Sequence, residues 1–132
     1  MGYTHYFELE ETINEETWKS ILMDVKSAAL ASYPLVQYEW DDKAAPQFDT
    51  KGIRFNGVGE LGHETFVLRP DDVSWAFCKT ARKPYDVLVV ATLIIVKHHC
   101  ETFSWSSDGE VEDFEDALEL LQSVGLDYAL HI

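Results

Sequence analysis

Three of the chain's ten basic residues lie close together, at Lys79, Arg82 and Lys83. Ammonium and guanidinium groups bind phosphate and carboxylate groups through charge-assisted hydrogen bonds. Pro84 follows directly, where it is expected to open a helix, and the free amides of a helix N-terminus also attract anions. The segment therefore predicts a site for an anionic group. A basic loop that balances carboxylates such as Asp86 explains the same residues equally well.

Five other polar residues are candidates to complete this site. Arg54 and Asn56 are expected on one face of a strand, where they offer a planar cation and an amide to a ligand. His5 and His63 are candidate phosphate contacts or acid-base groups, because histidine titrates near neutral pH. Tyr85 adjoins the basic segment. The alternatives are a structural ion pair for Arg54 and ordinary core or surface positions for the two histidines.

Cys78 directly precedes the basic residues and is a candidate nucleophile. A positive environment lowers the pKa of a thiol and favours the reactive thiolate. His63 with Asp86 is the other candidate for catalysis. Neither arrangement specifies a reaction, and a buried thiol is the more usual role of a cysteine. A small enzyme that acts on a nucleotide-like substrate is therefore kept as an alternative.

Neither a dinucleotide-binding fold nor a metal site is expected. Gly57, Gly59 and Gly62 have the spacing of a dinucleotide fingerprint, but that fingerprint must open a helix. The residues after Gly62 are typical of a strand, so the glycines predict a hairpin connection. The five histidines and two cysteines lack the spacing of a zinc site. No cofactor is expected.

The chain carries 24 acidic and 10 basic residues, a net charge of −14. This charge repels phosphate and disfavours direct binding to nucleic acid or to an anionic membrane. No Lys or Arg follows Lys97, and acidic residues dominate the last expected helix. Candidate contacts with a basic protein partner are Glu112, Asp113, Glu115 and Asp116. The alternatives are a solvated helix face and a charge that serves solubility alone.

Hydrophobic spacing and turn residues predict the secondary structure. Strands are expected where aromatic and β-branched residues lie between turns, over residues 3–9, 35–40, 52–56, 63–68, 102–106 and 127–132. Helices are expected at 3.6-residue spacing, over residues 14–34, 84–100 and 108–125. Asn14 is expected to cap the first of these helices. The apolar stretch 84–100 would also suit a buried strand, but its length favours a helix. The inner face of the last helix is expected to carry Val111, Phe114, Leu118 and Leu121. Residues 73–80 fit either a short strand or a turn of helix.

This order of elements predicts one α+β domain over residues 1–132. Its antiparallel sheet is expected to pack against two to three helices, with a split βαβ arrangement like that of ferredoxin-like folds. Two cysteines without framework spacing and a polar, aromatic N-terminus indicate a reducing cytosol.

Four segments together resemble a group of small hypothetical proteins of bacteriophages and bacterial mobile elements. These segments are Gly2 to Tyr6, Arg54 to Gly57, His63 to Phe66 and Phe77 to Asp86. The group's opening motif often continues with Trp, where this chain has Phe7. The resemblance implies a phage or prophage setting in the cytoplasm of a bacterial host, and it implies no particular activity.

The leading hypothesis is a phage-type protein that binds a small anionic, nucleotide-like ligand, for example to sequester a defence signal. Its ligand-binding residues would be the basic segment and the five polar residues named with it. The main alternative is an acidic inhibitor that imitates nucleic acid and occupies a basic groove on a host or defence protein.

Overall fold

The computed structural model describes residues 2–33, 35–39 and 41–131. Its helices and strands follow one another along the chain as β1 (Thr4–Leu9), α1 (Glu15–Ala31), β2 (Gln47–Asp49), β3 (Gly52–Phe55), β4 (Phe66–Leu68), β5 (Trp75–Lys79), α2 (Asp86–His99), β6 (Phe103–Ser107) and α3 (Glu115–Ser123). Short 3-10 helices lie at Gly59–Leu61 (η1) and Val111–Phe114 (η2). The α+β class is confirmed.

The strands form two antiparallel sheets of three strands, in the orders β5-β1-β6 and β2-β3-β4. Strands β5 and β6 both run antiparallel to β1, so they are parallel to each other, and α2 connects them. This is the expected split βαβ unit, with β1 between the two parallel strands. The backbone N–H of Glu64 joins the sheets by donating to the carbonyl of Lys79 at 3.2 Å.

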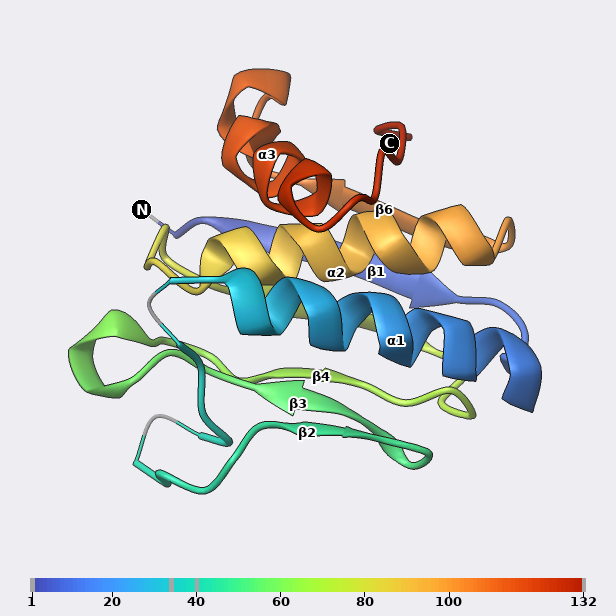
Figure 1. Cartoon of the computed structure of the whole chain (residues 1–132), viewed down its shortest axis with the longest axis horizontal. Coiled ribbons are helices and arrows are strands. Elements are labelled where there is room, and N and C mark those ends of the chain that lie inside the picture. The colour runs from blue at the N-terminus through green and yellow to red at the C-terminus, as the bar shows by residue number, and fades with distance from the viewer. Residues whose placement is uncertain (1, 34, 40, 132) are drawn as a thin grey trace.

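All three helices lie on one side of the sheets (Figure 1). Helix α1 buries one stripe of apolar side chains at helical spacing, from Trp18 to Ala29. Helix α2 is buried on all sides from Leu88 to Val96, because it contacts α1, α3 and β6. The apolar stretch that fitted either a helix or a strand is therefore the central helix of the core.

Local residues explain where the helices begin and end. The side chain of Asn14 accepts a hydrogen bond from the Thr17 amide at 2.9 Å, so it caps α1 as expected. Helix α1 ends at Ala31, and the expected stop at Pro34 lies outside the described residues. Gly125 follows α3 with a φ of 81°, a left-handed conformation that glycine adopts without strain.

Three strand predictions need correction. Residues 35–39 make isolated bridges, from Gln37 to Asn56 and from Glu39 to Asp42, in place of a strand, and Trp40 lies outside the described residues. Strand β4 begins at Phe66 instead of residue 63, because the Asn56 side chain forms hydrogen bonds with the backbone of His63. Residues 127–131 are not a strand, and Ile132 lies outside the described residues.

Two further segments near these elements are now defined. Residues 75–79 of the ambiguous stretch 73–80 form strand β5. The inner face of the last helix carries Phe114, Ala117 and Leu121, whereas Val111 is exposed. Val111 and Phe114 are the first and last residues of η2, the 3-10 turn before α3, and only Phe114 reaches the core. Leu118 is partly buried against the core, in line with its expected position.

Candidate functional site

The basic segment and the His63–Glu64 loop meet where the two sheets join. Glu64 receives a hydrogen bond on its carboxylate from the Lys79 amide, at 2.8 Å. Its carbonyl accepts from the Tyr85 hydroxyl at 2.5 Å. Two segments that the sequence predicted to belong to one site are thus neighbours, although His63 itself is exposed.

His5 connects the N-terminal strand to the start of α2. Its Nε2 atom lies 2.6 Å from Oδ1 of Asp86, and the Thr80 hydroxyl donates to the same oxygen at 2.5 Å. His5 and Thr80 are fully buried, and Asp86 is the first residue of α2. A carboxylate here also faces the positive end of the helix dipole. These contacts give His5 a structural role inside the core.

The start of α2 already has internal partners for its backbone amides. The amide of Asp86 donates to the Lys83 carbonyl at 2.8 Å, and that of Leu88 donates to the Tyr85 carbonyl at 3.1 Å. The Asp86 carboxylate supplies the negative charge that a helix start favours. The feature expected to hold an anion is therefore satisfied from within the chain.

The basic side chains of this segment point to different partners. The Arg82 guanidinium donates to Oδ1 of Asp113 at 3.0 Å and lies 4.0 Å from the centre of the Tyr3 ring. The Lys79 ammonium lies 5.7 Å from the centre of the Phe77 ring. Both side chains take positions that suit surface cations on a strongly acidic chain.

Arg54 and Asn56 lie in and directly after β3 of the second sheet, and both contact neighbouring segments of the chain. Arg54 forms an ion pair with Glu39 and lies over the Tyr38 ring at 4.6 Å, so its carboxylate partner differs from that of Arg82. Asn56 is fully buried, donates to the His63 carbonyl at 2.9 Å and accepts from the His63 amide at 3.0 Å. The Asn56 amide therefore shapes the hairpin loop from inside.

Cys78 has the character of a core residue. It is buried, and its Sγ lies 3.6 Å from the Glu64 carbonyl oxygen. Burial, with the nearby Glu64 carboxylate, raises the pKa of the Cys78 thiol to about 12. A thiol with this pKa is protonated at neutral pH, which removes the basis for a Cys78 nucleophile.

We expect the folded protein to react slowly with dithiobisnitrobenzoate at pH 8. A pKa of about 12 leaves about one Cys78 thiol in ten thousand as thiolate at this pH, and burial also raises the pKa of Cys100. In the variant Cys100→Ser, which leaves Cys78 as the remaining thiol, the rate should be at least about 100-fold below that of the same variant unfolded in guanidinium. Rapid reaction of one thiol in the folded protein would contradict this result and support the nucleophile hypothesis.

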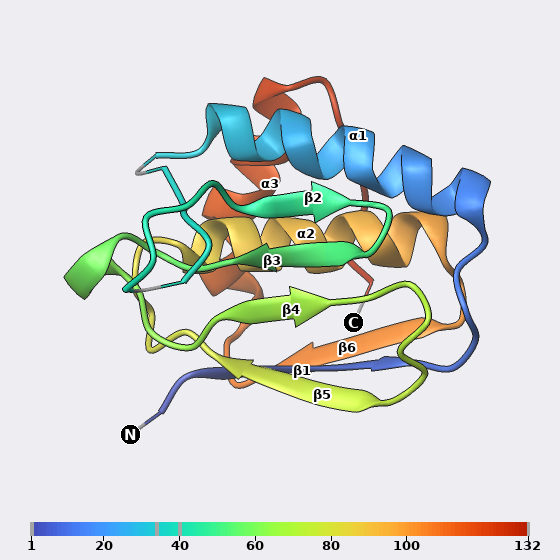
Figure 2. The ribbon, with the colours of Figure 1, turned by 90° about the horizontal axis from the view of Figure 1, so that it is seen from below.

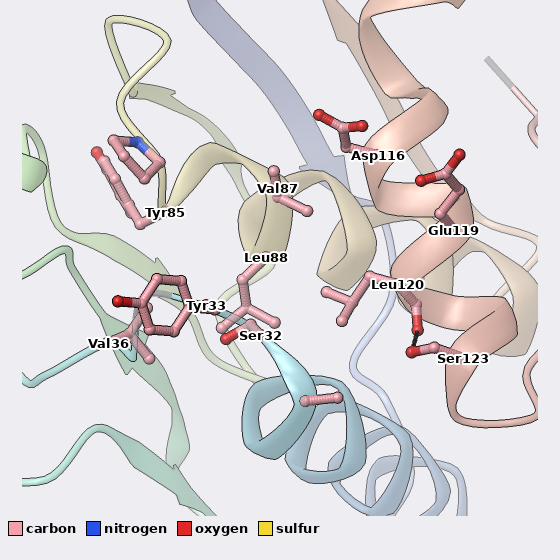
Figure 3. Close-up of a pocket in the computed structure, with 12 residues that line it drawn as sticks. Ser32, Tyr33, Val36, Tyr85, Val87, Leu88, Asp116, Glu119, Leu120 and Ser123 are labelled. Atoms are coloured by element: carbon pink, nitrogen blue, oxygen red, sulfur yellow. Dashed lines mark hydrogen bonds between the residues drawn. The ribbon is translucent and has the colours of Figure 1, made fainter.

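A groove with an acidic rim lies between the three helices. This interhelical groove, shown in Figure 3, has a volume of about 360 Å³. The C-terminal end of α1 and the start of α2 form one part of its wall, and α3 forms the other. Its apolar surface comes from Val36, Val87, Leu88 and Leu120. Asp116 and Glu119 extend from α3 at its rim (Figure 3).

The interhelical groove combines residues from both predicted sets. Tyr85 belongs to the predicted ligand-binding set and Asp116 to the predicted partner-binding set, and both line this groove. Tyr33, which is 93% exposed, stands at the same place. Glu119 was not among the predicted residues, although its position three residues after Asp116 places the two on one helix face.

An apolar hollow continues from the interhelical groove. Val36 lines both, and the second hollow has a volume of about 470 Å³. Its other lining residues include Leu30, Leu35 and Phe48, together with Lys26. Leu30 and Leu35 are large apolar side chains that remain mostly exposed to solvent. Together the two hollows offer an apolar track that ends at the acids of α3.

The four acids predicted to contact a partner have different surroundings. Asp113 accepts a hydrogen bond from the Glu110 amide at 2.8 Å as well as the one from Arg82. These two contacts hold the pKa of Asp113 below its usual range. Glu112, Glu115 and Asp116 are exposed. Asp113 therefore already has partners within the chain, whereas Asp116 is the member of the set that lines the interhelical groove.

Comparison with protein families, with curated proteins and with solved structures finds no match to this chain. Across the described ranges, no helix is long and apolar enough to cross a membrane. Within the same part of the chain, no group of three or more His, Cys, Asp or Glu side chains is arranged to hold a metal ion. What the chain does therefore has to be inferred from its own surfaces.

Proposed function

We propose that the chain is an acidic binding protein whose interhelical groove holds a basic, amphipathic segment of a protein partner. The observation that carries the proposal is the apolar groove with Asp116 and Glu119 at its rim. Apolar side chains of the partner would fill the groove, and its Lys or Arg residues would meet the two carboxylates. Burial of apolar area supplies most of the affinity in such contacts, and charge complementarity sets orientation and association rate.

The surroundings of the groove favour a cation near its rim. The last turn of α1 contains no basic residue, so the partial negative charge of its terminal carbonyls is not offset there. The positive end of α2, in the same part of the wall, is offset by the Asp86 carboxylate. With a net charge of −14, two copies of the chain repel each other, which favours a basic protein over self-association.

A phage setting suggests the kind of partner. The negative surface would imitate nucleic acid and engage a basic host or defence protein, as the main alternative hypothesis holds. In the earlier hypothesis the partner contacts only the acids of the last helix. In the present proposal it contacts acids of this helix and also fills the apolar groove. The proposal therefore requires both charge and apolar matching in the partner.

The defining experiment uses two synthetic peptides of opposite charge. One carries leucine at helical spacing with lysine elsewhere, and the other replaces every lysine by glutamate. We expect fluorescence anisotropy to show binding of the lysine peptide, weakened about tenfold as salt rises from low to physiological ionic strength. Equal binding of both peptides, or binding of neither, would exclude the proposal.

The anionic-ligand hypothesis is retained as a second proposal. The meeting of Lys79 and Tyr85 with the His63–Glu64 loop favours it, and the occupied amides at the start of α2 weigh against it. A bound nucleotide would raise the melting temperature by mass action. A nucleotide-dependent shift that disappears in the double variant Lys79→Ala, Arg82→Ala would support this second proposal over the first.

A further inference from the structure

The face of the β5-β1-β6 sheet that points away from the helices carries three neighbouring aromatic side chains. Tyr6 and Trp75 have ring centres 6.1 Å apart with planes 23° apart, and Trp75 and Phe77 have ring centres 5.6 Å apart. Trp75 is 57% exposed and Phe77 is 45% exposed. Figure 2 shows these strands on the side opposite the helices. Large aromatic groups left in solvent on one patch often mark an interaction site.

A hollow of about 310 Å³ lies beside these rings. Its lining includes Tyr6, Glu8 and Trp75, together with Ser104 and Ser106 on the neighbouring strand. Glu8 lies opposite Trp75 on one side and opposite Ser104 on the other, so the three side chains share one sheet face. The small serine side chains create the depression, and their hydroxyl groups can accept hydrogen bonds.

The charges at the two ends of this aromatic patch differ. The Lys79 ammonium lies near the Phe77 ring, at the end away from Glu8. Glu8 is exposed and has no ion-pair partner among residues 2–33, 35–39 and 41–131. A carboxylate that pairs with no cation in the described part of the chain therefore lies beside the exposed Trp75 side chain, on a chain of net charge −14.

We infer that this hollow binds the guanidinium group of an arginine side chain on a basic protein partner. Guanidinium is planar, stacks on tryptophan and tyrosine rings, and donates paired hydrogen bonds to a carboxylate. Trp75 and Tyr6 supply the rings, Glu8 supplies the carboxylate, and the serine hydroxyls accept the remaining donors. Lysine has no planar group to stack, so the site distinguishes arginine from lysine. The residues of this site lie outside the interhelical groove, so the inference does not depend on the proposed function of that groove.

Isothermal titration calorimetry with two short peptides tests this inference. Both contain glycine and four basic residues, arginine in one and lysine in the other. We expect the wild-type protein to bind the arginine peptide at least about fivefold more tightly than the lysine peptide. Trp75→Leu should remove this preference, and Glu8→Gln should weaken arginine-peptide binding about fivefold. Both side chains are exposed, so the variants should keep the wild-type melting temperature.

Two controls distinguish the arginine site from the interhelical groove and from a nucleobase site. The groove variant Asp116→Lys, Glu119→Lys should retain the preference for arginine, which distinguishes failure here from failure of the proposed function. Equal affinity for both peptides would overturn the inference, and so would a preference that survives Trp75→Leu. Tighter binding of adenosine than of the arginine peptide, lost in Trp75→Leu, would assign the aromatic patch to a nucleobase and would also overturn it.

Discussion

Replacing Asp86 by alanine is expected to lower the free energy of unfolding by about 3 kcal/mol. The Asp86 carboxylate contacts two fully buried groups, the His5 ring at 2.6 Å and the Thr80 hydroxyl at 2.5 Å. Without it, both lose their partner in a place where water does not replace it. Urea unfolding followed by circular dichroism measures the change, and the melting temperature should fall by about 10 °C.

A matched variant makes this test specific. Glu112→Ala also removes one carboxylate near a helix start, but Glu112 is exposed, so its effect should stay within about 0.5 kcal/mol. His5→Ala combined with Asp86→Ala should cost less than the sum of the two single changes, because each residue is the other's partner. A loss below about 0.5 kcal/mol for Asp86→Ala would show that the His5–Asp86 contact does not stabilise the core.

The double substitution Asp116→Lys, Glu119→Lys is expected to weaken binding of the leucine–lysine peptide about 100-fold. It replaces two attractive charges at the rim of the interhelical groove by two repulsive ones. The control is Glu10→Lys, Glu11→Lys, which changes the net charge equally at exposed positions between β1 and α1. This control should weaken binding less than about fivefold.

The comparison of these two variants decides between a local and a general charge effect. If both weaken the peptide equally, the peptide responds to the net charge of the chain and the groove is not its site. Leu88 offers no better test, because it is buried and its replacement would damage the core. Substitution of the exposed rim residues Asp116 and Glu119 should change peptide binding with little effect on folding.

The sequence predicted structure well where the residues that determine it are close together in the chain. The Asn14 cap and the start of the buried helix after Pro84 follow from patterns within short segments, and the split βαβ unit follows from the order of the elements. The Glu64 contacts with Lys79 and Tyr85 also agree with the expectation that these segments belong together. Such patterns are readable because capping, helical spacing and turn residues act over a few positions.

Features that the sequence did not predict depend on how distant elements pack. The His5–Asp86 contact joins a strand and a helix that are 81 residues apart, and no local pattern indicates it. The interhelical groove requires α3 to lie beside α1 and α2, so only the folded chain shows that Tyr33 and Glu119 line one site. Likewise, the exposed patch around Trp75 arises from the register of β1 with β5, within a stretch whose secondary structure was ambiguous.

Packing of distant elements also gives the basic segment internal partners that its sequence did not indicate. Cations before a helix commonly indicate an anion site. Here Asp86 stands at the helix start and Asp113 approaches from η2 to pair with Arg82. Both carboxylates come from the chain itself, one against the Arg82 guanidinium and the other at the start of α2.

The central claim is that the interhelical groove binds a basic amphipathic segment, and amide and methyl chemical-shift mapping tests it most directly. Titration of the labelled protein with the leucine–lysine peptide should shift the signals of Ser32, Leu88, Asp116, Glu119 and Leu120, which line the groove. Residues of η1, which line neither hollow, should remain unchanged. Saturable shifts confined to other surfaces, or no shifts at a peptide concentration that saturates anisotropy, would contradict the proposal.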